Sequence, residues 1–151
     1  MKLAASVKVS FFVKPEEDEQ ALLQAFKTLF PFNLDEIELK RTNAEGFSER
    51  KIKIYEAMLS KDRHCNAFVK FMMEKLSTEQ KRQLLEQIDS RLHDDLHFYF
   101  RFDKDSLVKL GQLWLTDGGN CFHIGISVAA FPKKKDVAKK LLTELLTENI
   151  K

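Results

Sequence analysis

Residues 97–140 read HFYFRFDKDSLVKLGQLWLTDGGNCFHIGISVAAFPKKKDVAKK, and this stretch decides the fold. In its first part, phenylalanines alternate with Tyr99 and Arg101, which is the pattern of a strand with one buried face. An apolar run at 121–130 predicts another strand, and a Gly-Gly turn predicts a hairpin that joins this run to a strand at 110–116. Lysines then follow Pro132 at the start of a helix. The stretch predicts an apolar sheet edged with basic side chains.

The rest of the chain is assigned by the same periodicity arguments. The expected strands are 5–13, 34–41, 51–59, 96–102, 110–116 and 121–130, and helices are expected from Pro15, Asp62 and Ser77 and after Pro132. The order is β-α-β-β-α-α-β-β-β-α. It predicts an α+β fold in a single domain, residues 1–151, with a largely antiparallel sheet and helices packed on one face.

Two of the helix starts carry recognisable signals. Pro15 opens the first expected helix, and the acidic residues 16–19 place negative charge on its positive N-terminal pole. Ser77 and Gln80 have the spacing of a capping box, which predicts a further helix immediately after Ser77.

Composition places the chain among ordinary globular proteins. With 151 residues, 44% of them hydrophobic, it is long enough for one buried core and short for two. The net charge is only +2, so local clustering has to decide whether a nucleic acid binds. Cys65 and Cys121 form no disulfide framework, which favours a reducing cytoplasm. The sequence shows no apolar leader segment and no run long enough to span a membrane, so we expect a soluble cytoplasmic protein.

Three segments together resemble one family of archaeal proteins. They are residues 11–31, with an acidic helix start and a helix that ends in Leu-Phe-Pro; residues 98–104, which end in Arg-Phe-Asp-Lys; and residues 126–134, a strand with a basic helix start. The chain resembles the archaeal RNA-binding proteins described as predicted exosome subunits, whose fold is similar to that of the fifth protein of the large ribosomal subunit. The resemblance implies a non-catalytic RNA-binding protein, with the exosome or other RNA-processing proteins as expected partners.

The chain departs from this family at two points. The family has a Thr before the Glu-Asp of its first helix, where this chain has Pro15-Glu16, so we expect that helix to lack a side-chain cap. The family also carries a Gly-x-x-Gly-Asn-Pro turn before its third strand, of which this chain keeps only Gly46. Arg50 and Lys51 are expected to replace that turn as phosphate contacts.

Basic residues gather at two junctions, at the end of the strand 96–102 and at the start of the last helix. Clustered lysines and arginines bind phosphates through charge and counterion release, and lysines at a helix N-terminus oppose the helix dipole, which favours a functional reason for them. In the purely structural interpretation, Arg101 pairs with a nearby aspartate and the lysine run is only solvated. Tyr99 shares the strand face of Arg101 and is the ring expected to stack on bases. The predicted RNA-binding residues are Arg50, Lys51, Tyr99, Arg101, Lys104, Lys133, Lys134 and Lys135.

Other functions have less support in the sequence. Cys121 and His123 share a strand face, and His93 and His97 lie four residues apart, but neither pair completes a metal site, so no metal or cofactor is expected. The chain has no P-loop and no Gly-x-Ser-x-Gly, Gly-x-Gly-x-x-Gly or His-Glu-x-x-His motif, so an enzyme is not expected. A protein-interaction or scaffold module is the main alternative, because an uncovered sheet face could dock a partner.

Overall fold

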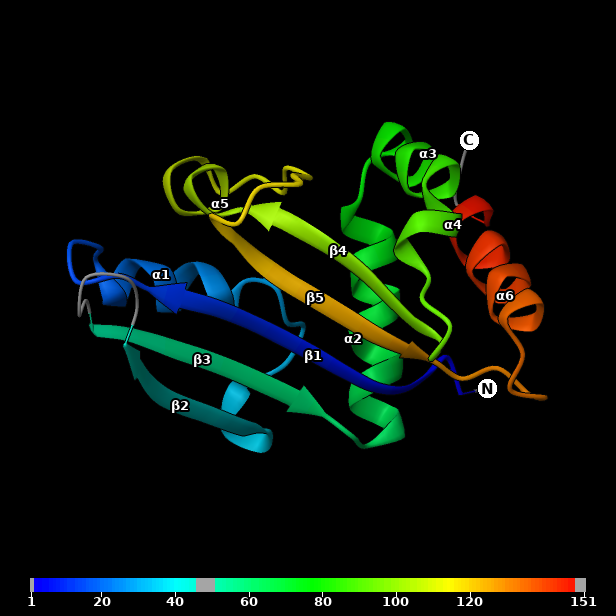
Figure 1. The fold of residues 1–151 in the computed structure, drawn as a ribbon, viewed down its shortest axis with the longest axis horizontal. Helices are drawn as coiled ribbons and strands as arrows, with labels where there is room; N and C mark the ends of the chain where they lie inside the picture. Colours follow the sequence, from blue (N-terminus) through cyan, green and yellow to red (C-terminus); the bar gives the residue numbers. More distant parts are fainter. Residues whose placement is uncertain (1, 46–50, 149–151) are drawn as a thin grey trace.

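Within residues 2–45 and 51–148, which the computed structural model describes, five strands form one antiparallel sheet in the order β2-β3-β1-β5-β4 (Figure 1). The elements in chain order are β1 (Ala4–Val13), α1 (Glu19–Lys27), η1 (Leu34–Glu36), β2 (Glu38–Glu45), β3 (Lys51–Leu59), α2 (Asp62–Lys75), α3 (Thr78–Glu86), α4 (Ile88–Arg91), β4 (His97–Asp103), α5 (Lys104–Leu110), β5 (Cys121–Val128) and α6 (Lys135–Thr147). None of the described helices is both long and apolar enough to cross a membrane.

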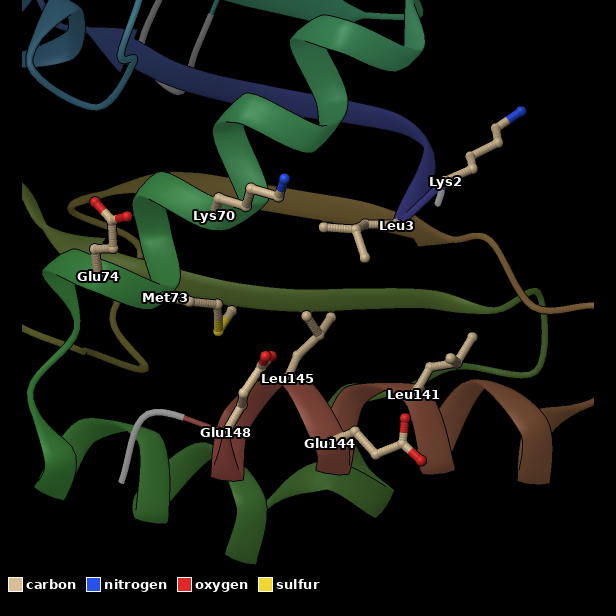
Figure 2. Close-up of a pocket in the computed structure, with 9 residues that line it drawn as sticks. All are labelled: Lys2, Leu3, Lys70, Met73, Glu74, Leu141, Glu144, Leu145 and Glu148. Carbon is tan, nitrogen blue, oxygen red and sulfur yellow. The ribbon is translucent and has the colours of Figure 1, made fainter. Parts of the chain in front are cut away.

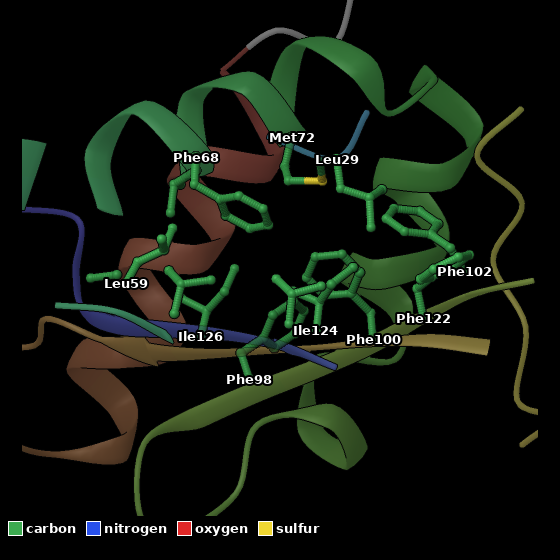
Figure 3. Packing of buried hydrophobic residues seen from close by; sticks show 14 of the residues in the cluster. Leu29, Leu59, Phe68, Met72, Phe98, Phe100, Phe102, Phe122, Ile124 and Ile126 are labelled. Carbon is green, nitrogen blue, oxygen red and sulfur yellow. The ribbon is translucent and has the colours of Figure 1, made fainter. Parts of the chain in front are cut away.

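One face of the sheet carries the hydrophobic core. Phe98, Phe100 and Phe102 of β4 are buried on this face, as the alternation of the sequence predicts. α2 crosses the same face, and its Phe68 and Met72 pack over the strands (Figure 3). The predicted fold class is therefore confirmed: an α+β domain whose antiparallel sheet is covered by helices on one face.

The opposite face of the sheet is open and is the face seen in Figure 1. Lys8 and Phe12 of β1, and Tyr99 and Arg101 of β4, lie on it, because they alternate with the core positions. α3, α4 and α6 pack beside the β4 edge and leave the strands β1 and β5 uncovered (Figure 1). This arrangement leaves room for a binding surface along β4.

The strand predicted at 110–116 is wrong. α5 extends to Leu110 and ends at Gly111, whose φ of 64° is the left-handed conformation that glycine adopts most readily. The chain then returns along β4 with a single bridge, between Leu115 and Phe102, and β5 pairs directly with β4. In place of the predicted hairpin, β5 pairs with β4, and α5 and a long loop connect these two strands.

The first helix also differs from its prediction. It begins at Glu19 and not at Pro15, and Asp18 accepts a hydrogen bond from the Ala21 amide at 3.2 Å, so the helix does have a side-chain cap. A short 3-10 turn takes residues 34–36, and the strand expected from 34 therefore starts at Glu38. The capping box predicted for the helix after Ser77 is confirmed.

Candidate functional site

A groove of about 660 Å³ lies beside β4, between α4 and the open face of the sheet. Residues from several elements line it, among them Arg91, His93, Tyr99, Arg101, Asp117 and His123. The register brings them together: Arg101 of β4 lies directly opposite His123 of β5, and Tyr99 lies opposite Gly125. Residues far apart in the sequence therefore form one polar, aromatic surface.

Tyr99 occupies the centre of this surface and is surrounded by imidazole rings. Its ring centroid lies 4.8 Å from that of His93, 5.9 Å from that of His97 and 5.3 Å from that of His123. The contact with His93 is edge-to-face and that with His97 is stacked, both of which are favourable geometries for π-systems. Tyr99 is half-buried, so its ring is held in place while part of it remains exposed to the groove.

Two guanidinium groups flank the tyrosine. Arg91 donates from Nε to the Gln87 side chain at 2.8 Å and from Nη1 to the Tyr99 carbonyl at 3.3 Å, and its Nη2 lies 3.3 Å from a carboxylate oxygen of Asp117. Arg101 donates from Nη1 to the Asp117 carbonyl at 3.3 Å. Both groups are oriented by protein acceptors, and the Asp117 carboxylate that pairs with Arg91 is 89% exposed.

The electrostatics of the groove act on His123. Burial lowers the pKa of this imidazole, and the positive charges of Arg101 and Lys8 lower it further. Lys8 lies on the neighbouring strand opposite Gly125, where it pairs with Glu56 at 3.4 Å. Arg101 of β4 and Lys8 of β1 therefore act on His123 from the two strands that flank β5.

Lys104, one of the predicted RNA-binding residues, is buried and does not lie on this surface. Its side chain is 2% exposed, and its ammonium donates to the Phe12 carbonyl at 2.7 Å and pairs with Glu17 at 3.2 Å. The ammonium is therefore hydrogen-bonded inside the fold, and Lys104 connects the start of α5 to the end of β1. Because its ammonium is buried and paired, Lys104 presents no exposed charge to an RNA.

The lysine run 133–135 is placed away from Arg101. β5 begins near Arg101 and ends at Val128, so Lys133, Lys134 and Lys135 follow the far end of that strand. All three are exposed, and Lys135 pairs with Asp94 at 3.2 Å. The strand rise puts His97, opposite Ser127, about 13 Å from Arg101, and the run lies beyond it.

Lys51 is exposed at the start of β3, two strands from β5 in the sheet. Arg50, like Gly46, lies outside the described residues. Of the predicted site residues, the structure therefore brings Tyr99 and Arg101 together in the groove and places Lys51 and the lysine run elsewhere.

No pattern in the sequence singles out Arg91 or Asp117, and His123 was not among the predicted RNA-binding residues. The signal for His123 is the β4–β5 register, because a partner of Arg101 must share its face. Among the described residues, no group of three or more His, Cys, Asp or Glu side chains is arranged to hold a metal ion. Cys65 and Cys121 are both buried, and burial raises the pKa of each thiol.

The fold and the groove define a class: a small α+β protein with one open sheet face and a cationic, aromatic groove at the sheet edge. The family described as RNA binding matches residues 6–129, and the chain belongs to this family.

Known proteins similar to the chain agree with this assignment. RNA-binding protein PAB1135 of Pyrococcus abyssi is 29% identical over 145 residues, which cover 95% of this chain and 94% of that protein. The crystal structure of protein AF2318 from Archaeoglobus fulgidus is 27% identical, with a TM-score of 0.83 over 94% of this chain and 99% of that one. Mth689 from Methanothermobacter thermautotrophicus, 22% identical with a TM-score of 0.77 over 95% of this chain and 98% of its own, shares the fold.

Proposed function

We propose that this chain is a non-catalytic RNA-binding protein and that the groove beside β4 is its RNA-binding site. Membership of the RNA-binding family supports an RNA-binding role. One observation carries the choice of site: Arg91, Arg101, Tyr99 and two imidazoles line the same groove. Guanidinium groups and exposed rings are the side chains that bind phosphates and unpaired bases.

The arginines supply the phosphate contacts in this proposal. A guanidinium group presents several N–H donors in a fixed plane, which matches the oxygens of a phosphate. Among the described residues, Arg101 donates hydrogen bonds to the carbonyls of Asp117 and Gly118 from Nη1 alone. Its remaining donors are therefore available to a phosphate oxygen, and the carbonyls that accept from Nη1 keep the group oriented.

The rings supply the base contacts. Tyr99 is fixed among the histidine rings, and Phe12, on the same open face two strands away, is 49% exposed. Stacking on tyrosine or phenylalanine requires a base that is not already paired, so the proposed ligand is single-stranded RNA or an RNA loop. The proposed path therefore runs from the groove onto β5 and β1.

Among the residues predicted from the sequence, Tyr99 and Arg101 form the centre of this interface. Lys51, at the start of β3, is retained only as a distant phosphate contact, and Arg50, outside the described residues, stays a prediction. A scaffold function at the open face has less support, because the exposed Met58 lies in a row with Lys8 and Glu38 and so forms no wide apolar patch.

The test is fluorescence anisotropy with a labelled single-stranded RNA of about 16 nucleotides. Arg101→Glu should weaken binding at least about tenfold, which corresponds to about 1.4 kcal/mol. Arg63→Glu is the control for the change of charge, because Arg63 carries the same charge, is more exposed than Arg101 and lies on α2, on the other side of the sheet. The affinity of the wild-type chain should fall with salt by about 0.7 logarithmic units per phosphate contacted.

Equal affinity of the Arg101→Glu and Arg63→Glu variants would remove the groove from the proposal. Cleavage of the RNA during the same measurement would contradict the non-catalytic role. Association with the exosome and a cytoplasmic location remain finer parts of the proposal, and co-purification with RNA-processing subunits from native cells tests the first of them.

A further inference from the structure

A second groove, of about 410 Å³, lies between α2 and α6. Its floor is apolar: Leu3, Met73, Leu141 and Leu145 point toward one another between the two helices (Figure 2). α2 lies on the core side of the sheet, so this groove is separate from the one beside β4. We call it the α2–α6 groove.

The rim of the α2–α6 groove is acidic on the α6 side. Glu144 extends from α6, Glu148 caps its C-terminus and Glu74 extends from the end of α2 (Figure 2). Lys70 of α2 and Lys2 also line the groove, and Lys2 pairs with Asp62 at 3.6 Å, so the glutamates outnumber the lysines there. None of these three exposed carboxylates forms an ion pair with another residue in the described part of the chain. An apolar floor with unpaired carboxylates fits an occupant that carries an apolar side chain and several positive charges.

The chain itself carries a segment of that chemistry. Phe131 is 94% exposed, and Lys133, Lys134 and Lys135 follow it in exposed positions. We call residues 131–135 the basic arm. Lys135 anchors the base of the arm to Asp94, which leaves Phe131 and the other two lysines free to extend from the body of the protein.

Most charges at the two ends of α6 are unfavourable for that helix alone. Lysines at its N-terminus and glutamates near its C-terminus oppose the helix dipole, whereas Asp136 in its first turn favours it, and Lys134 at the N-cap makes no side-chain capping bond. An antiparallel α6 from another molecule would reverse both effects, because each acidic end would then face a positive N-terminal end. The helix has 13 residues and is therefore about 20 Å long, so one such pairing brings the arm of each molecule to residues 144–148 of the other.

We propose that two copies of this chain form a reciprocal dimer in which the basic arm of each occupies the α2–α6 groove of the other. The Phe131 ring enters the apolar groove, and Lys133 and Lys134 pair with the glutamates on its rim. A twofold axis that crosses α6 near its middle makes both contacts equivalent, as an isologous interface requires. The two grooves share no lining residue, so the proposed contact does not use the groove beside β4.

The first measurement is the mass of the full-length chain by sedimentation velocity at low salt, over concentrations up to roughly 100 µM, which covers weak dimers. We expect a dimer that dissociates as salt rises, since ion pairs at an exposed rim are screened. Phe131→Ser, the double variant E144K/E148K and the triple variant K133E/K134E/K135E should each be monomeric. Combining the double and the triple variant restores opposite charges across the interface and should restore the dimer.

The triple variant K27E/K61E/K109E is the matched control, because it changes the same charge at exposed lysines outside the arm and should remain dimeric. Circular dichroism confirms that each variant is folded. A wild-type chain that is monomeric at every concentration would overturn the proposal, as would a charge-swapped variant that stays monomeric. So would a K133E/K134E/K135E variant that loses RNA affinity but keeps the wild-type mass, because the arm would then bind RNA.

Discussion

The Tyr99 ring lies over Gly125, its partner on the neighbouring strand. A Cβ atom built on Gly125 would lie 2.9 Å from Cε1 of Tyr99, closer than real side chains approach one another. The glycine therefore lets the ring lie down on the sheet, where His93 and His123 hold it from the sides. This cross-strand contact fixes the one ring at the centre of the proposed RNA-binding groove.

We expect Gly125→Ala to displace this ring. The extra methyl group must push Tyr99 away from the sheet, which should cost about 1–3 kcal/mol of unfolding free energy, as overpacking typically does. RNA affinity should fall several-fold in the folded variant, because the stacking surface moves. Urea titration and RNA anisotropy measure the two effects, and the double variant Gly125→Ala with Tyr99→Leu should recover stability but not RNA affinity. An unchanged stability of Gly125→Ala would show that the ring has room to move.

Lys104 gives a second prediction, one of stability. Lys104→Met should reduce the free energy of unfolding by about 3 kcal/mol, because it leaves the Phe12 carbonyl without its donor and Glu17 without its cation. Adding Glu17→Gln should cost less in the variant than in the wild-type chain, since the pair is already broken. Chemical denaturation checks both. RNA affinity at temperatures where the variant is folded should be unchanged, and a loss of affinity there would return Lys104 to the RNA-binding site.

Local patterns predicted the fold well where one face of a strand is buried. The phenylalanines of β4 and the capping box at Ser77 follow from neighbouring residues alone, and both are confirmed. The segment 110–116 alternates in the same way, yet it forms no strand, because its expected partner β5 pairs with β1 on one edge and with β4 on the other, which leaves Leu115 a single bridge to Phe102 of β4. Competition between two segments for one strand edge is a long-range effect that the alternation of either segment does not show.

The site was harder to predict for the same reason. Tyr99 and Arg101 share a strand face, and that alternation was enough to place them together. Lys104 carries the same charge but meets Glu17, which is 87 residues away in the sequence, so its burial could not be foreseen. Arg91 enters the groove only because α4 packs beside β4, and no local pattern indicates that contact.

Removing the charge of Asp117 should raise RNA affinity, whereas the other substitutions in the groove should lower it. Its carboxylate pairs with Arg91 at 3.3 Å at the edge of the groove and is almost fully exposed. A phosphate that binds Arg91 must compete with this negative charge. Asp117→Asn should therefore raise RNA affinity about two- to fivefold, the effect expected from removing one like charge near the ligand. Asp136→Asn, an exposed change at the start of α6, is the control and should have no comparable effect. Weaker binding by Asp117→Asn would mean that the aspartate positions Arg91 for RNA.

His123 gives the groove a dependence on pH whose sign follows from its surroundings. Burial and the charges of Arg101 and Lys8 lower its pKa below the ordinary 6.5, so the folded chain binds a proton there less readily than the unfolded chain does. The free energy of unfolding should therefore fall as the pH drops below 6.5.

A bound phosphate favours the protonated ring of His123, so RNA should bind more tightly over that same pH range. Affinity measured from about pH 7.5 to about pH 5.5 should rise, and His123→Gln should reduce the rise while leaving affinity at the upper pH nearly unchanged. His93 and His97 also lie around Tyr99 and can contribute, so the difference between the two pH profiles, and not the profile of the wild-type chain alone, isolates His123. Parallel profiles for the two proteins would show that no phosphate approaches this imidazole and that RNA contacts the groove at its Arg91 side instead.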